Sequence, residues 1–203
     1  MCGKRLKIAV LISGNGSNLQ ALIDACKHPD YPAQITCVIS NNAEAYGLTR
    51  AKTAGIPAQI IDHKNYRTRE EFDDALLEIL KPYQPDLICL AGFMRILTPV
   101  FINSYTGRIL NTHPSLLPKF GGPGMYGNHV HEAVIKAGET ISGCSIHEVI
   151  TDVDKGTIIC QETVPVLPDD TAETLAKRVI AQEHIAYPKA VALMAQRLKP
   201  QIA

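Results

Sequence analysis

Short apolar runs alternate with helically spaced apolar positions over the first half of the chain. The runs are rich in β-branched residues and bounded by turn residues, which is typical of buried strands. They occupy residues 7–13, 35–40, 58–61 and 87–91. The segments between them predict helices over 19–26, 43–54 and 68–80, the last with a capping box of Thr68 and Glu71. Because strands that alternate with helices form right-handed βαβ units, this half of the chain predicts a parallel sheet.

The pattern becomes more mixed after residue 107. A further strand is predicted at 108–112, and the segment 117–128 (LPKFGGPGMYGN) is too rich in Pro and Gly for anything but a long loop. The remaining elements are a short helix over 129–137, an antiparallel strand pair at 143–150 and 157–164, and a terminal helix over 172–198 with a bend near Pro188. We therefore expect an α/β fold with a Rossmann-like, mostly parallel sheet, helices on both faces and a mixed C-terminal half. The chain is interpreted as one domain over 1–203, with halves of about 1–107 and 108–203.

Composition narrows the class of partner. Twenty Lys plus Arg balance twenty Asp plus Glu in 203 residues, so the net charge is zero, and aromatic residues make up only 5% with no Trp. These numbers disfavour electrostatic capture of nucleic acid, a base-stacking platform and a membrane anchor, and they favour small-molecule partners. The six cysteines form no Cys-x-x-Cys pair, and the apolar run at 8–12 is too short for a signal peptide or a membrane span. We expect reduced thiols and a cytoplasmic location; a homodimer stays open.

A glycine-rich turn follows the first predicted strand. Gly14 and Gly16 lie between that strand and a helix, where unpaired amides and the helix dipole favour an anion. A dinucleotide site would need a third glycine, where Leu19 stands, and an acid at the end of the second strand, where Asn41 and Asn42 stand. The turn therefore favours a single phosphate group, with a merely tight structural turn as the alternative.

Asn111 and His113 lie two residues apart at the end of a predicted strand, so their side chains share one face. An amide donor beside an imidazole suits stabilisation of an oxyanion on a carbonyl under attack, although a structural hydrogen-bonded pair is the simpler alternative. Asp154, in the loop between the last two strands, is a carboxylate that could assist a histidine. His147 is interpreted as a structural histidine.

Other chemistries fit these residues less well. Asp152-x-Asp154-x-Gly156 lacks the glycine and the closing glutamate of a calcium loop. Ser13 and Ser115 are not in a Gly-x-Ser-x-Gly motif, which disfavours a serine hydrolase. His129 and His131 diverge at a helix start and are not expected to bind a metal.

Five segments occur in an order that is similar to a known family. They are SGNGSN (13–18), AGFMRIL (91–97), NTHPSLLP (111–118), DKG (154–156) and QEH (182–184). Over nearly its whole length the chain resembles the phosphoribosylglycinamide formyltransferases, a family of folate-dependent formyltransferases. The resemblance implies transfer of a formyl group from 10-formyltetrahydrofolate to the amine of glycinamide ribonucleotide in purine biosynthesis, without a metal.

The resemblance also implies roles for individual residues. Asn111 would orient the formyl oxygen, His113 would donate a proton to the tetrahedral intermediate, and Asp154 would raise the pKa of His113 and help to move the amine proton. The ribonucleotide would be bound by Gly16, Ser17, Asn18 and Glu183. The folate would be bound by Arg69, Met94, Arg95, Ile96, Leu97, Asn111, Ile150, Thr151, Asp152, Val153 and Asp154. A cis peptide is implied at Leu117-Pro118.

Two features depart from the family pattern, and three related functions compete. The segment 120–128 is longer than in the shortest members, and Thr151 replaces an acid found in some. Formyltetrahydrofolate hydrolases carry an N-terminal regulatory domain, for which a strand starting at Lys7 leaves no room. Methionyl-tRNA formyltransferases need a further basic RNA-binding domain. A non-catalytic folate- or nucleotide-binding module would not need Asn111, His113 and Asp154 together.

Overall fold

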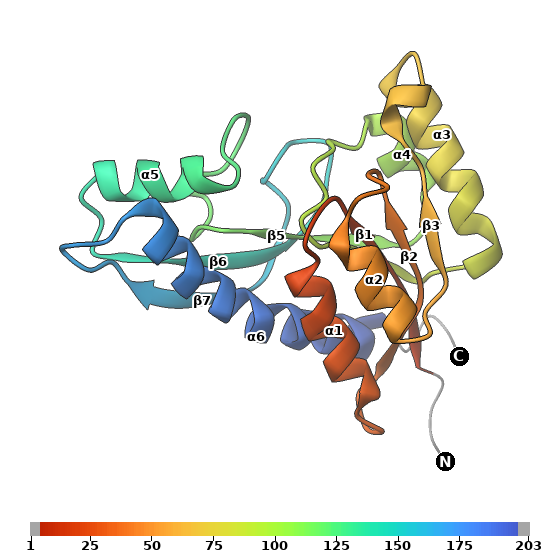
Figure 1. Cartoon of the computed structure of the whole chain (residues 1–203), viewed down its shortest axis with the longest axis horizontal. Helices are drawn as coiled ribbons and strands as arrows, with labels where there is room; N and C mark the ends of the chain where they lie inside the picture. Colours follow the sequence, from red (N-terminus) through yellow and green to blue (C-terminus); the bar gives the residue numbers. More distant parts are fainter. Residues whose placement is uncertain (1–4, 199–203) are drawn as a thin grey trace. The chain divides into compact units, whose positions relative to one another are not determined.

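The computed structural model describes residues 5–198, and Cys2 lies outside them. Its strands form a seven-stranded sheet in the order β3-β2-β1-β4-β5-β6-β7 (Figure 1). The strands are β1 (Leu6–Ile12), β2 (Ala33–Ser40), β3 (Ala58–Ile60), β4 (Leu87–Leu90), β5 (Arg108–His113), β6 (Ile141–Glu148) and β7 (Ile158–Pro165). The helices are α1 (Ser17–Lys27), α2 (Tyr46–Thr53), α3 (Arg69–Leu80), α4 (Pro99–Ser104), α5 (Asn128–Lys136) and α6 (Ala172–Leu198). Two 3-10 turns, η1 (His63–Asn65) and η2 (Lys81–Tyr83), flank α3.

The chain divides into two compact units, which are described separately. The first holds the described residues up to Leu110 together with those from Val191 onward, and the second is Asn111–Ala190. The boundary falls inside β5 and close to the change of pattern expected near residue 107. The expectation of a single domain stays a prediction.

The first unit is built on parallel strand pairs. β1 pairs in parallel with β2 on one side and β4 on the other, and β2 pairs in parallel with β3. Ile8, Val10 and Ile12 of β1 are completely buried, as expected for a central strand that is covered on both faces. α1 packs beside α2, and α3 packs against α4. The parallel sheet expected from the alternating pattern is confirmed.

The carboxyl ends of β1, β2 and β4 lie at one edge of this sheet because the strands are parallel. The turn after β1 therefore lies beside the segments that follow β2 and β4. Ser13 shows this directly: its Oγ donates to Oδ1 of Asn41 at 2.5 Å and accepts from the Met94 amide at 2.7 Å. This edge carries the glycine-rich turn and the 91–97 segment.

The second unit contains the antiparallel pair of β6 and β7, as the sequence predicts. The segment between β5 and α5 forms neither helix nor strand, and it includes the cis peptide at Leu117-Pro118. α6 runs through Pro188 without ending.

Two helix starts differ from the pattern-based expectation. α2 begins at Tyr46 instead of 43 because the side chain of Asn42 accepts from the Glu44 amide, which holds a turn there. α4 was not expected at all, although Thr98 caps it and Pro99 opens it, which are both helix-start signals.

Candidate active site

The glycine-rich turn joins β1 to α1 through a close approach of two glycines. Gly16 has φ +72, and a Cβ added to it would lie 2.8 Å from Cα of Gly47. Only glycine fits position 16, because the backbone is left-handed and the space for a side chain is filled. α1 begins with Ser17 and Asn18, and Gly16 before them has no side chain that could cap the helix. The main-chain amides of the first turn therefore have no capping side chain to accept their hydrogen bonds. This geometry suits an anion.

The segment after β4 exposes an apolar surface in the first unit. Met94 and Ile96 are 56% and 54% exposed, Arg95 is half-buried, and Leu97 is buried. Arg69 is exposed at the first position of α3. Exposed Met and Ile side chains beside a structured loop are typical of a surface that binds an apolar ring. Leu97 is instead part of the core, and its role as a folate contact stays a prediction.

In the second unit the structure brings Asn111, His113 and Asp154 together, with a fourth residue. His113 is 4% exposed, and its Nδ1 lies 3.5 Å from Oδ2 of Asp154. Oδ1 of Asp154 lies 3.5 Å from Nε2 of His147, which in turn lies 3.3 Å from Nδ2 of Asn111. Asp154 thus lies between two buried imidazoles. The sequence interpretation of His147 as a structural histidine did not anticipate these contacts, and its role stays a prediction.

The loop after β5 completes the surroundings of His113. Nε2 of His113 lies 2.8 Å from the main-chain oxygen of Phe120, which can only accept, so Nε2 carries a hydrogen. In the neutral ring the lone pair is therefore on Nδ1, the nitrogen that faces Asp154. The Gly122 amide donates to Oδ2 of Asp154 at 2.9 Å.

His147 also carries a hydrogen on a nitrogen that faces a main-chain oxygen. Its Nδ1 lies 3.0 Å from the main-chain oxygen of Glu148 and must donate, so Nε2 of the neutral ring accepts from the Asn111 amide. One amide hydrogen of Asn111 is used in this way, and the second is left for a substrate oxygen.

Burial and charge set opposite protonation tendencies in this cluster. Burial lowers the pKa of His113, and the negative charge of Asp154 opposes this shift without overcoming it. Asp154 therefore raises the pKa of His113, as expected, and burial lowers this pKa by more. Burial alone would raise the pKa of Asp154, but the hydrogen bond that the charged ring of His147 donates from Nε2, the hydrogen bond from Gly122 and the charges of both histidines hold this pKa below the usual value.

The remaining predicted ligands of the second unit lie in its loop and last helix. Ile150, Thr151 and Asp152 are exposed between β6 and β7, whereas Val153 is half-buried. Glu183 of α6 is only 5% exposed, and its charge adds to the burial that raises the pKa of Cys144 to about 12.

Known proteins match this chain over nearly its full length. A family model described as formyl transferase matches residues 6–191. The phosphoribosylglycinamide formyltransferase of Haemophilus influenzae is 46% identical over 97% of this chain and 92% of its own. The trifunctional purine biosynthetic protein adenosine-3 of Bos taurus is 50% identical over 95% of this chain, which spans only 18% of that relative. Among solved structures, glycinamide ribonucleotide transformylase 1 from Symbiobacterium toebii has a TM-score of 0.90 and 44% identity, covering 96% of this chain and 89% of its own.

The chain belongs to the formyl transferase family. The match to the solved structure also confirms the α/β fold with a mostly parallel sheet and a C-terminal antiparallel pair. The roles given above to single residues stay predictions.

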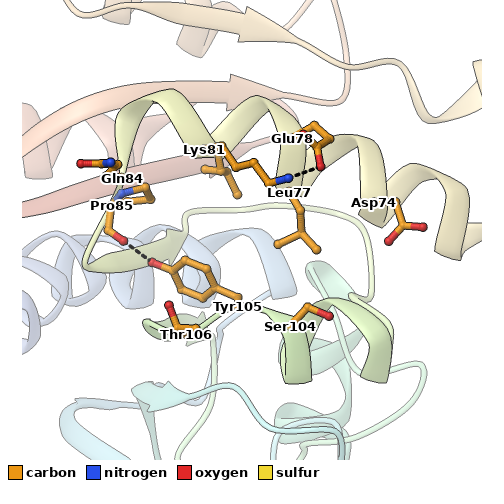
Figure 2. Close-up of a pocket in the computed structure, with 10 residues that line it drawn as sticks. Asp74, Leu77, Glu78, Lys81, Gln84, Pro85, Ser104, Tyr105 and Thr106 are labelled. Carbon is orange, nitrogen blue, oxygen red and sulfur yellow. Dashed lines mark hydrogen bonds and ion pairs between the residues drawn. The ribbon is translucent and has the colours of Figure 1, made fainter.

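A cavity of this formyl transferase lies away from the residues that the sequence singles out. It has a volume of about 700 Å³ and lies in the first unit between α3, η2 and α4, beside the segments that precede β4 and β5 (Figure 2). On its wall the Tyr105 hydroxyl donates to the Pro85 oxygen at 2.8 Å, and Lys81 pairs with Glu78. The amino end of β4 is opposite the edge that carries the glycine-rich turn, so the cavity is separate from the candidate anion site.

The described part of this formyl transferase can also be compared with the expectations about metal sites and membrane-spanning helices. Within residues 5–198, no cluster of three or more His, Cys, Asp or Glu is arranged to hold a metal ion. Over the same range, no helix has both the length and the apolar composition to cross a bilayer. His129 is exposed and His131 is buried, so the two side chains diverge as expected.

Proposed function

We propose that this chain transfers the formyl group of 10-formyltetrahydrofolate to the amine of glycinamide ribonucleotide, as a step of purine biosynthesis. The observation that carries the proposal is the cluster of Asn111, Asp154 and the buried His113 in a chain that matches a phosphoribosylglycinamide formyltransferase over 92% of that relative's length. Such a cluster is a device for moving protons beside a reacting carbonyl.

The first step forms a bond between the substrate amine and the formyl carbon. An electron pair moves to the formyl oxygen, which becomes an oxyanion. The second amide hydrogen of Asn111 is available to this oxygen, and the protonated ring of His113 donates to it from Nδ1, because Nε2 is held by the Phe120 carbonyl. These two donors stabilise the tetrahedral intermediate.

The second step breaks the bond between the formyl carbon and N10 of the folate. Asp154 accepts the proton that the attacking amine loses, directly or through one water, and this proton is passed on to N10 as it leaves. As the oxyanion collapses to the new carbonyl, the hydrogen that it shares with His113 stays with the ring. The net change is one bond formed, one bond broken and one proton moved from the amine to N10. The lowered pKa of Asp154 keeps the carboxylate ionised, so that it is free to accept a proton, and also makes it a weaker base.

The lowered pKa of His113 has two consequences for its role. The imidazolium is a stronger acid, and a smaller fraction of the enzyme carries it at neutral pH. The attraction of Asp154 for the charged ring offsets part of that loss.

The binding roles follow the two units. In the first, the amides at Gly16, Ser17 and Asn18 hold the phosphate, while Arg69 and the 94–97 segment hold the folate. In the second, Glu183 contacts the ribonucleotide, and the loop of Ile150, Thr151, Asp152 and Val153 closes over the pterin. Both substrates are small, and we expect the reaction to need no metal, nucleic acid or membrane.

An assay with both substrates tests the proposal. The purified protein is incubated with glycinamide ribonucleotide and 10-formyltetrahydrofolate in the presence of EDTA, and formylated product and tetrahydrofolate are measured. Equal amounts of both products support the proposal. Release of formate without acceptor formylation would indicate a hydrolase instead, and binding of both ligands without turnover would indicate a binding module.

A further inference from the structure

Arg50 of α2 holds the glycine-rich turn through three hydrogen bonds. Its Nε donates to the main-chain oxygen of Asn15 at 2.9 Å, and its Nη2 donates to Oδ1 of the same residue at 3.0 Å. Nη1 donates to Oε1 of Gln20 at 3.1 Å. All three donors are thus directed at the segment that leads from the turn into α1.

Packing restrains the guanidinium in this position. Its Cζ lies 4.9 Å from the centroid of the Tyr46 ring, one helical turn earlier on α2. A cation held over an aromatic face loses rotamer freedom, so Arg50 is ordered in the direction of the turn. Gly47, between these two residues, donates its amide to the Gly14 oxygen at 3.1 Å, which fixes α2 against the turn.

The contact with the Asn15 oxygen determines where the next amide points. The Asn15–Gly16 peptide is trans, so its C=O and N–H point in opposite directions. A carbonyl held towards Arg50 therefore directs the Gly16 amide away from Arg50.

We propose that Arg50 is a positioning residue that aims the Gly16 amide at the phosphate of the substrate. The inference rests on the proposed function, in which the turn binds the phosphate of glycinamide ribonucleotide. Arg50 acts through the planar fork of its guanidinium, because one side chain has to reach both oxygens of Asn15 and also Gln20. A positive charge alone, which lysine would also supply, does not fix the peptide.

The test compares Arg50→Ala, Arg50→Lys and the control Lys52→Ala, which removes an exposed cation from the same helix. Ribose 5-phosphate is titrated calorimetrically into each protein. We expect Arg50→Ala to raise the Kd about tenfold, as for a lost charge-assisted hydrogen bond, and Arg50→Lys to raise it by at least half as much on a logarithmic scale, which is about threefold. Lys52→Ala is expected to bind like the wild type. Arg50→Lys with wild-type affinity, or a wild type that does not bind the probe, would overturn the inference.

Kinetics separate positioning from general structural support. We expect the KM for glycinamide ribonucleotide to rise about tenfold in Arg50→Ala, by the same energetic reasoning, while the KM for the folate and kcat are preserved. The KM for the riboside, which lacks the phosphate, should not change. An equal loss with the riboside would assign Arg50 a merely structural role. If the wild type did not formylate the ribonucleotide at all, the proposed function would fail, while the titration would still decide the role of Arg50.

Discussion

Nδ1 of His113 lies 3.5 Å from Oδ2 of Asp154, and both side chains are shielded from solvent. The Phe120 carbonyl at Nε2 leaves Nδ1 as the nitrogen that can exchange a proton with a substrate. This relationship motivates the first prediction.

Replacement of His113 by Ala is expected to lower kcat by about 10²–10⁴-fold, the usual contribution of one general acid. The affinity for ribose 5-phosphate should stay within about twofold, because the proposed phosphate contacts are in the other unit and binding does not use the proton. Single-turnover kinetics and calorimetry measure the two effects. A variant with wild-type turnover would exclude His113 as the proton donor.

His147 is predicted to act through Asp154. Since the charged ring of His147 donates from Nε2 to Asp154 and helps to hold the pKa of that carboxylate down, the change His147→Ala raises that pKa. Activity should then be lost at a higher pH on the acidic side of the pH–rate profile, with a fall in kcat of about tenfold from one lost hydrogen bond to a charged group.

The conservative variant His147→Gln serves as the control for this shift. Its side-chain amide can reach Asp154 as a donor, so we expect it to restore most of the wild-type pH–rate profile. An unchanged profile in His147→Ala would mean that His147 supports only the fold.

Stability is predicted to fall as the pH decreases from 7.5 to about 5.5, because the pKa values of His113 and His131 are lowered by burial from 6.5. Below 6.5 the unfolded chain binds protons that the folded chain does not, so acid favours unfolding. Urea denaturation at several pH values gives the free energy of unfolding at each pH, and so its slope against pH.

The change His131→Gln isolates one of these two contributions. The slope of the free energy of unfolding against pH is proportional to the difference in bound protons between the unfolded and the folded chain. His131→Gln removes the contribution of His131 to this difference and should reduce the slope. His129 is exposed, so His129→Gln should leave the slope unchanged. A free energy of unfolding that is constant over this range would contradict the burial of neutral imidazoles.

The close approach of Gly16 and Gly47 predicts a large cost for Gly16→Ala. The matched control is Gly55→Ala, where φ is +68 and no atom lies within 4 Å of the added Cβ, so only backbone strain is introduced. Gly55→Ala should cost about 1 kcal/mol of stability. Gly16→Ala adds the contact with Cα of Gly47 at 2.8 Å, and it should cost about 2–3 kcal/mol and raise the Kd for ribose 5-phosphate. If both variants lost the same free energy of unfolding, the turn would be able to shift and relieve the contact between position 16 and Gly47.

The parts of the site that local pattern encodes could be predicted from the sequence. The strand–glycine–helix turn and the Asn111-x-His113 pair lie within a few neighbouring residues, and the periodicity of side chains fixes their geometry.

Residues whose role depends on distant partners could not be predicted in this way. His147 meets Asp154 and Asn111 only after β6 is placed in the sheet. Asp73 is almost fully buried on α3, in a pattern that predicts an apolar face, because its Oδ2 accepts from the Thr98 amide at 2.7 Å, at the start of α4. The carboxylate is buried because it contacts a residue 25 positions later in the sequence. The periodicity of side chains along a single helix carries no information about such a distant contact.

The hydrogen-bond acceptor that selects the His113 tautomer is a main-chain oxygen. A substitution at position 120 by any residue that tolerates its left-handed backbone changes the side chain and leaves this oxygen in place. The left-handed φ of +54 at Phe120 is one that Asn or Gly adopts more readily, so even those exchanges preserve the loop path. The tautomer of His113 therefore does not depend on the side chain at position 120. It is lost only when the loop backbone moves, as with an insertion, a deletion or a proline at this position.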